Sequence, residues 1–266
     1  MYLFIPKNIE EVYNLTEYYD GLILSMENLS INYPVFSFDE IKKIINDISD
    51  KKIFINLNKN MHNDDIPLLK NVLKELDELN IEGIFYYDLS VYNIGSKHDL
   101  VWSVCHMTTN YKTCDFWNRR GVKYTFLSNE ITLNEIEEIS KNTSMDLMVQ
   151  VFGYVPIFAS KRNIIKNYKK TFNIDDDSDV NYIKNENDLY PIINQNETVV
   201  YNSKILNAID EIEKYENMNI KYFIINSFLI DNIEEVLKKF KNNIKFEIDN
   251  QGKGFLYEET IYKVKK

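Results

Sequence analysis

The sequence has few cysteines, few glycines and no long apolar segment, and each shortage excludes a class of protein. Its two cysteines, Cys105 and Cys114, are too few for a disulfide framework, so we expect reduced thiols. Among seven glycines there is neither a P-loop nor a dinucleotide-binding fingerprint, and no HExxH metalloprotease motif occurs. The first residues, MYLFIP, are too short for a signal peptide or a membrane span. We therefore expect a cytoplasmic protein that makes no membrane contact.

Positive charge is also in short supply, since 31 Lys and Arg residues face 41 Asp and Glu residues and leave a net charge of −10. This balance disfavours general charge-driven binding to nucleic acid or anionic membrane, although it leaves room for a local basic patch. The chain does have length and apolar content. Its 266 residues, 44% of them hydrophobic, are enough to bury a large core without disulfides.

A short apolar run, a polar turn and an amphipathic helix recur at a spacing of roughly 25–30 residues, which is typical of βα units. About eight such units fill the chain, as they do in a TIM barrel. The expected strands are Tyr2–Ile5, Leu22–Leu24, Ile53–Leu57, Gly83–Tyr87, Leu100–Val104, Tyr124–Leu127, Leu147–Phe152 and Tyr222–Ile225. The sequence therefore predicts an α/β fold, a TIM-like (β/α)8 barrel that forms one domain over residues 1–266.

Helix starts are marked by a capping residue followed three positions later by Glu, because the two side chains together satisfy free amides of the first turn. The pairs are Ser37 with Glu40, Thr132 with Glu135, and Asp231 with Glu234. Apolar residues follow at helical spacing and should face the sheet: Ile41, Ile44, Ile45 and Ile48; Leu133, Ile136 and Ile139; Ile233, Val236, Leu237 and Phe240. The longest expected helix runs from about Asp65 to Leu79, with Pro67 in its first turn.

One interval breaks this rhythm. The next helix after the strand that ends at Phe152 is expected near Ser203, roughly twice as far away as a βα connection needs. Long insertions after a barrel strand usually extend from the C-terminal face, where the active sites of this fold lie. We therefore expect residues 153–202 to be a segment inserted after the seventh strand, on the C-terminal face.

Several segments resemble peptidase family U32, in the same order along the chain. They are FWNRRGVKYTFL (116–127), LSNEITLNEIEEI (127–139), VFGYVPIFASKRNIIKNY (151–168), LYPI (189–192) and VYNSKILNAIDEIEKY (200–215). The third resembles the signature segment of the family, which includes collagenase-like proteases by name and proteins of RNA and ubiquinone hydroxylation. The resemblance implies a peptidase by family name, but the sequence shows no protease nucleophile or metal site.

The resemblance breaks at the iron–sulfur cluster of the family. The signature holds two cysteines seven positions apart and two more follow downstream, but here Pro156 and Asn163 occupy the first two positions. No cysteine follows Cys114. Since a cubane cluster needs four thiolates, we expect this chain to bind neither that cluster nor another cofactor or metal.

Three residues are candidates for a catalytic role at the barrel mouth. Glu130 follows a predicted strand and matches the Glu of the family, as a general base or ligand anchor, or else it is a charge favoured by the helix dipole. His106 follows another strand, where an imidazole suits proton transfer near neutral pH; a structural hydrogen bond is the alternative. Arg162 matches the signature Arg and suits a bidentate contact with carboxylate or phosphate.

Five further residues are candidates for substrate binding: Asn56, Asn58, Asp88, Tyr154 and Lys161. The first three lie at strand ends, where Asn and Asp equally serve as turn formers and helix caps. The other two belong to the segment that resembles the signature. Lys161 also begins a basic stretch, residues 161–170, with Tyr168 among its lysines. That stretch fits either an RNA contact or a solvated helix face.

Three functions stay open on the sequence, and with them the question of whether the chain is an enzyme. The first is the peptidase activity of the family name, with a small-molecule, peptide or RNA-linked substrate bound at the barrel mouth. The second is a non-catalytic, cluster-free role in tRNA or cofactor hydroxylation, paired with a cluster-bearing family member. The third is metal-free hydrolysis of small peptides.

Overall fold

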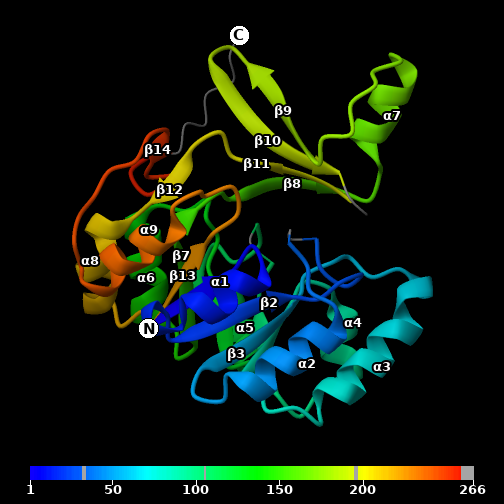
Figure 1. The fold of residues 1–266 in the computed structure, drawn as a ribbon. Helices are drawn as coiled ribbons and strands as arrows, with labels where there is room; N and C mark the ends of the chain where they lie inside the picture. The colour runs from blue at the N-terminus through cyan, green and yellow to red at the C-terminus, as the bar shows by residue number, and fades with distance from the viewer. Residues whose placement is uncertain (32–33, 105, 195–196, 259–266) are drawn as a thin grey trace.

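Eight parallel strands close into a barrel in the computed structural model, which describes residues 1–31, 34–104, 106–194 and 197–258. They are β1 (Tyr2–Ile5), β2 (Gly21–Ser25), β3 (Lys52–Leu57), β4 (Gly83–Tyr86), β5 (Asp99–Trp102), β6 (Tyr124–Phe126), β7 (Asp146–Gly153) and β13 (Tyr222–Asn226). Strands β1 to β7 pair in chain order, and β13 pairs in parallel with both β1 and β7, which closes the sheet (Figure 1). The predicted (β/α)8 barrel is confirmed, and each predicted strand overlaps one barrel strand.

Helices pack on the outside of the barrel (Figure 1). They are α1 (Ile9–Asn14), α2 (Phe38–Asp47), α3 (Ile66–Leu76), α4 (Leu89–Ile94), α5 (Tyr111–Asn118), α6 (Leu133–Asn142), α8 (Ile212–Asn217) and α9 (Ile233–Lys241). The capping boxes predicted at Ser37 and Thr132 begin α2 and α6. The cap predicted at Asp231 is wrong, because the turn through Leu229, which has a positive φ, carries the chain one residue further and leaves Asn232 in the cap position.

Two predicted helix boundaries also differ from the structure. The helix expected over Asp65–Leu79 is α3, which ends at Leu76. The backbone N–H groups of Glu78 and Leu79 bond three residues back, to Glu75 and Leu76, and so form a turn in place of a further α-helical turn. The helix expected near Ser203 is absent from that position. The chain there forms β12 (Ile205–Asn207), which pairs with the end of β7 and with β14 (Gln251–Gly252) before α8 begins.

The predicted apolar stripes face the barrel. All of those on α2, α6 and α9 are buried in one cluster between the sheet and the helices, together with Leu69, Val72, Leu73 and Leu76 of α3. A second cluster fills the inside of the barrel with alternate strand residues, among them Phe54, Phe85, Met148 and Ile224. Within the described ranges, no helix combines the length and the apolarity that crossing a bilayer requires.

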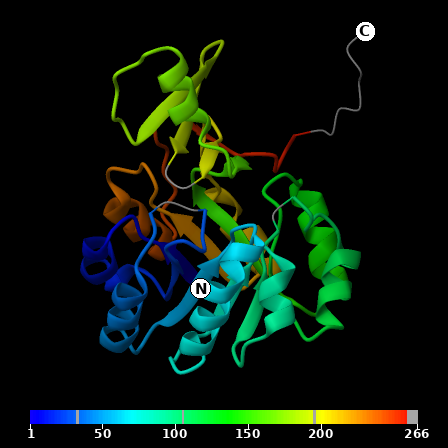
Figure 2. The same cartoon turned by 90° about the vertical axis from the view of Figure 1, so that its right-hand side faces the viewer.

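A second, antiparallel sheet rises from the carboxyl ends of the barrel strands (Figures 1 and 2). Its strands are β8 (Pro156–Ser160), β9 (Val180–Asn185), β10 (Asp188–Asn194) and β11 (Thr198–Tyr201), in the order β8-β11-β10-β9. Helix α7 (Ile164–Thr171) lies between β8 and β9 along the chain. Ile193, Val199 and Tyr201 pack on Phe228, which follows β13. The predicted insertion after the seventh barrel strand therefore forms a sheet of its own, and one face of that sheet rests on the barrel.

Gly153 ends β7 at the junction between barrel and insertion, and we predict that Gly153→Ala strongly destabilises the protein. Its φ is +107°, and a Cβ atom would lie 2.4 Å from the carbonyl oxygen of Asn226. The clash and the strained backbone together should lower the free energy of unfolding by about 2–4 kcal/mol, measured by equilibrium urea denaturation. Gly121 is the control, because its φ is +82° but no described atom lies within 4 Å of the added Cβ. Equal losses for Gly153→Ala and Gly121→Ala would contradict the steric argument.

Candidate functional site

The inner residues of the barrel change from apolar to polar toward the carboxyl ends of the strands. Five strands contribute apolar interior residues: Ile23, Phe54, Val101, Met148 and Ile224. Because side chains alternate along a strand, the residue two positions later points to the same side. Those later residues are Ser25, Asn56, Ser103, Gln150 and Asn226, and all five are buried. The barrel thus carries an uncharged polar layer directly above its apolar interior.

This polar layer borders a cavity of about 90 Å³, here called the mouth cavity. Its polar lining consists of Asn56, Asn58, Ser103, Asn129, Gln150 and Asn226. Phe85, Tyr87 and Phe126 form an aromatic wall. Among the described residues that line it, none carries a charge. The mouth cavity therefore suits an uncharged ligand that has polar edges and a flat apolar face.

Two of the amides around the mouth cavity use their nitrogen atoms within the protein. Asn56 Nδ2 donates to Ser25 Oγ over 3.2 Å. Gln150 Nε2 donates to the carbonyl oxygens of Phe152 and Tyr154, at 3.3 and 3.1 Å. The side-chain oxygens of these two residues make no hydrogen bond to any residue that the structure describes. Asn56 and Gln150 therefore offer hydrogen-bond acceptors to a ligand.

Two other amides use their oxygen atoms. Asn58 Oδ1 accepts hydrogen bonds from Ser30 Oγ (2.7 Å) and from the backbone N–H of Ile31 (3.1 Å). Asn226 Oδ1 accepts one from the backbone N–H of Phe228 (3.0 Å). Their amide nitrogens have no acceptor in the described part of the chain, so Asn58 and Asn226 offer donors. The mouth cavity thus presents both kinds of hydrogen-bonding group, in fixed orientations.

The three predicted catalytic residues do not share a cavity. His106 is exposed at the rim, where its Nδ1 lies 3.3 Å from the hydroxyl of Tyr87, a residue of the mouth cavity. Arg162 is exposed on the insertion just before α7. Glu130 lies in a separate, adjoining pocket. Their catalytic roles stay predictions, and the geometry does not join them into one reacting group.

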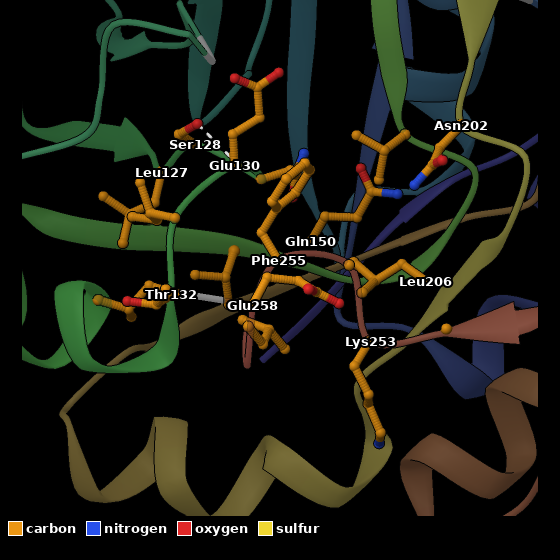
Figure 3. Close-up of a pocket in the computed structure, with 18 of the residues that line it drawn as sticks. Leu127, Ser128, Glu130, Thr132, Gln150, Asn202, Leu206, Lys253, Phe255 and Glu258 are labelled. Carbon is orange, nitrogen blue, oxygen red and sulfur yellow. Dashed lines mark hydrogen bonds between the residues drawn. The ribbon is translucent and has the colours of Figure 1, made fainter. Parts of the chain in front are cut away.

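Glu130 belongs to a pocket of about 800 Å³ on the flank of the mouth, here called the flank pocket (Figure 3). It shares Asn129 and Gln150 with the mouth cavity, so the two cavities adjoin. Glu130 is exposed, and its backbone N–H donates to Ser128 Oγ over 3.1 Å, which is the dashed line in Figure 3. Residues of the segment 252–258, Phe255 among them, line the flank pocket together with Gln150.

Of the five predicted binding residues, two line the mouth cavity and three hold the structure around it. Asn56 and Asn58 do line the mouth cavity together. Asp88 instead holds local structure, since its carboxylate accepts from the backbone N–H groups of Ser90 (2.8 Å) and Met61 (3.1 Å) and caps α4.

Tyr154 is half-buried, and burial above all raises the pKa of its hydroxyl. Its backbone carbonyl holds Gln150, and its ring lies 6.3 Å from that of Phe228. These contacts make Tyr154 part of the frame that orients the mouth cavity.

Lys161 belongs to an ionic cluster that ties the insertion to the loop after β3. Its Nζ lies 3.7 Å from Asp65 Oδ2, and Lys59 Nζ lies 3.0 Å from Asp65 Oδ1. Burial raises the pKa of the nearby Glu197 carboxyl, against the lowering effect of the two lysines. The Lys161 ammonium thus supports the position of the insertion above the mouth.

Sequence reasoning missed four residues of the polar layer, Ser25, Ser103, Gln150 and Asn226, and also Asn129, which lines the mouth cavity. The signal was present for four of them, because each lies two positions after an apolar interior residue of its strand. Asn129 lies in the loop after β6, where no such period applies.

A sequence model of peptidase family U32 matches residues 8–263. The chain belongs to peptidase family U32. Two proteins of Bacillus subtilis (strain 168) are similar to this U32 chain. tRNA hydroxylation protein P2 is 28% identical over 207 residues, which cover 72% of this chain and 67% of that protein. tRNA hydroxylation protein P1 is 24% identical over 121 residues, covering 44% of this chain and 29% of that protein.

Solved structures share the fold of the U32 chain. The U32 peptidase Mk0906 superposes with a TM-score of 0.55 at 14% identity, over 84% of this chain and 91% of that one. N-(5'-phosphoribosyl)anthranilate isomerase from Pyrococcus furiosus superposes with a TM-score of 0.50 at 8% identity, over 92% and 98%. At these identities the likeness concerns the barrel fold alone.

The residues present do not fit the iron–sulfur cluster of the U32 signature. Pro156 offers no ligand atom in its side chain, and Asn163 Oδ1 accepts a hydrogen bond from Asn194 Nδ2 over 3.1 Å. Asn194 Oδ1 and Thr198 Oγ1 in turn accept from the first backbone N–H groups of α7, at 3.2 and 3.0 Å. The described residues contain no group of three or more His, Cys, Asp or Glu side chains placed to hold a metal. Hydrogen bonds between neutral groups thus occupy this place.

Cys114 is a buried residue of α5 with a free thiol, and burial raises the pKa of that thiol to about 12. We predict that the native thiol reacts with iodoacetamide at pH 8 about a thousandfold more slowly than the unfolded thiol, because the reactive thiolate is rarer by that factor. The rate is measured by mass spectrometry in a Cys105→Ser background, with and without denaturant. Similar rates in both conditions would show that Cys114 is accessible in the native fold.

Proposed function

We propose that this U32 chain takes part in the hydroxylation of tRNA, and that its mouth cavity receives a nucleobase. The observation that carries the proposal is the set of four side-chain amides that line the mouth cavity, here called the amide ring: Asn56, Asn58, Gln150 and Asn226. Two of them leave an oxygen and two leave a nitrogen without a partner among the described residues, and aromatic side chains line the same cavity. Proteins read unpaired bases by hydrogen bonds to their edges and by stacking on aromatic rings. The similarity to the two Bacillus tRNA hydroxylation proteins supports the same choice.

The uncharged lining that the described residues give the mouth cavity favours a base over a peptide terminus. A free carboxylate or ammonium group of a peptide would lose its hydration there without meeting an opposite charge, which costs several kcal/mol (about 2–7 for an uncompensated polar group alone). A neutral base loses far less. Its edge carries both donors and acceptors, as the free atoms of Asn56, Gln150, Asn58 and Asn226 require.

Peptide hydrolysis, which the family name implies, has no support among the described residues. The hydrogen bonds of the histidine rings join His106 to Tyr87 and His98 to the carbonyl oxygen of Leu76. Within the described ranges, no such bond pairs a histidine with a serine, threonine or cysteine nucleophile, as a hydrolase of that type needs. We therefore place tRNA hydroxylation before proteolysis.

The oxidation step itself belongs, in this proposal, to a cluster-bearing member of the family that acts with this chain in the cytoplasm. The supporting observation is that the place of the signature cysteines holds Pro156 and the hydrogen-bonded Asn163, within an otherwise intact frame. The chain would contribute the base-binding mouth and the partner the redox chemistry.

Mass spectrometry of tRNA nucleosides from a deletion strain tests the proposal. We expect one hydroxylated nucleoside to disappear, to return with the wild-type gene, and to stay at least tenfold lower with Asn56→Leu or Asn226→Leu. Each change removes a buried hydrogen bond to the base, worth about 1–3 kcal/mol. Asn71→Leu, an exposed change on α3, is the matched control and should restore the nucleoside fully. Unchanged tRNA nucleosides together with an altered peptide pool would instead support the family name.

A further inference from the structure

The insertion carries a concentration of exposed apolar side chains that the rest of the surface lacks. Half of the exposed large hydrophobic residues lie between residues 157 and 189, and two of the most exposed are Tyr168 (54%) and Phe172 (61%) on and after α7. The centroids of their rings are 4.6 Å apart. Such a patch marks a binding surface, because exposed aromatic groups are normally scattered.

On α7 and just before it lie cations that form no ion pair with a described residue. Arg162, Lys166 and Lys170 are exposed, and none forms an ion pair with a residue that the structure describes. By contrast, Lys161 and Lys169 are paired with Asp65 and Asp176. Lys166 and Lys170 are four residues apart and therefore share one side of α7.

The positive charge of this stretch is opposite in sign to the net charge of the whole chain. Residues 161–170 hold five cations and no carboxylate, whereas the whole chain has a net charge of −10. A polyanion is repelled by most of the surface and attracted to this stretch, so the charge distribution selects where it docks. Unpaired bases add stacking on aromatic side chains, which α7 also exposes.

We propose that α7, together with Arg162, is an RNA-contacting arm. Arg162, Lys166 and Lys170 contact phosphates, and Tyr168 with Phe172 stacks against unpaired bases of the same tRNA. The inference rests on the proposed function and adds where the tRNA is held outside the mouth. Figures 1 and 2 place α7 at the outer end of the insertion, on the side of the barrel where the strands end. The arm therefore lies on the same side of the barrel as the mouth cavity.

Fluorescence anisotropy of the full chain with tRNA purified from the deletion strain measures the contribution of the cations. Lys166→Ala/Lys170→Ala should weaken binding about tenfold and lower the slope of log affinity against log salt by about 1.5, because two phosphate contacts are lost. Lys70→Ala/Lys74→Ala, two exposed lysines on α3, is the matched control and should bind as the wild type does. Thermal melting of each variant confirms that it is folded.

A second pair of variants separates stacking from apolar contact with a protein. Tyr168→Leu/Phe172→Leu keeps apolar area but removes the rings, and should weaken tRNA binding about tenfold, whereas Tyr168→Phe should retain it. An arm that docks on a protein would tolerate Leu. Loss of self-association or of a copurified protein, with tRNA affinity intact in the arm variants, would overturn the inference.

The outcomes also separate this inference from the proposed function. The mouth variant Asn56→Leu should keep the nucleoside at least tenfold lower but leave the slope of log affinity against log salt unchanged, because it removes no phosphate contact. If the wild-type chain binds no tRNA, both the arm and the proposed function are wrong. If it binds tRNA and the arm variants bind equally well, or if the α3 control loses as much affinity as they do, only the arm is wrong.

Discussion

Parallel pairing of β13 with both β1 and β7 is the interaction on which the rest of the structure depends. Without it, seven strands would form an open sheet with two unpaired edges and an exposed inner face. With it, the carboxyl ends of all eight strands meet around one opening. Side chains from strands at opposite ends of the sequence, such as Asn56 on β3 and Asn226 on β13, then line a single cavity. The candidate site exists because the barrel is closed.

Closure also sets the chemistry of that cavity. A closed barrel interior is inaccessible to water, so its lower positions are apolar, and polar groups are tolerated only near the opening where they find partners. Gln150 and Asn226 meet this condition by bonding, with one atom each, to the end of their own strand or to the residues after it. Asn56 and Asn58 bond instead to the end of β2 and to the segment after it. The other atom of each amide is left, held in place, for a ligand. An uncharged site of this kind recognises hydrogen-bonding pattern and shape rather than net charge.

Neutral hydrogen bonds hold the insertion together at the place where the resemblance to the U32 signature implies cluster cysteines. Asn163, Asn194 and Thr198 hold α7 to its sheet through neutral hydrogen bonds, and Thr198 is fully buried. A hydrophobic contact with Phe228 and an ionic contact through Lys161 fix the sheet on the barrel. These contacts hold the insertion beside the mouth, with Arg162, Lys166 and Lys170 exposed along α7 and just before it.

The sequence by itself determined the eight strands, the apolar faces of the helices, the capping boxes at Ser37 and Thr132, and the loss of the cluster cysteines. All of these rest on periodicity, on contacts three or four residues apart, or on residue identity alone. Only the tertiary structure decided that Asn56 faces the mouth while Asp88 caps a helix, that Glu130 lies in a separate flank pocket, and that Gln150 and Asn226 complete the amide ring. These depend on which strand ends become neighbours and on which atom of each amide finds a partner, and those contacts join residues far apart along the chain.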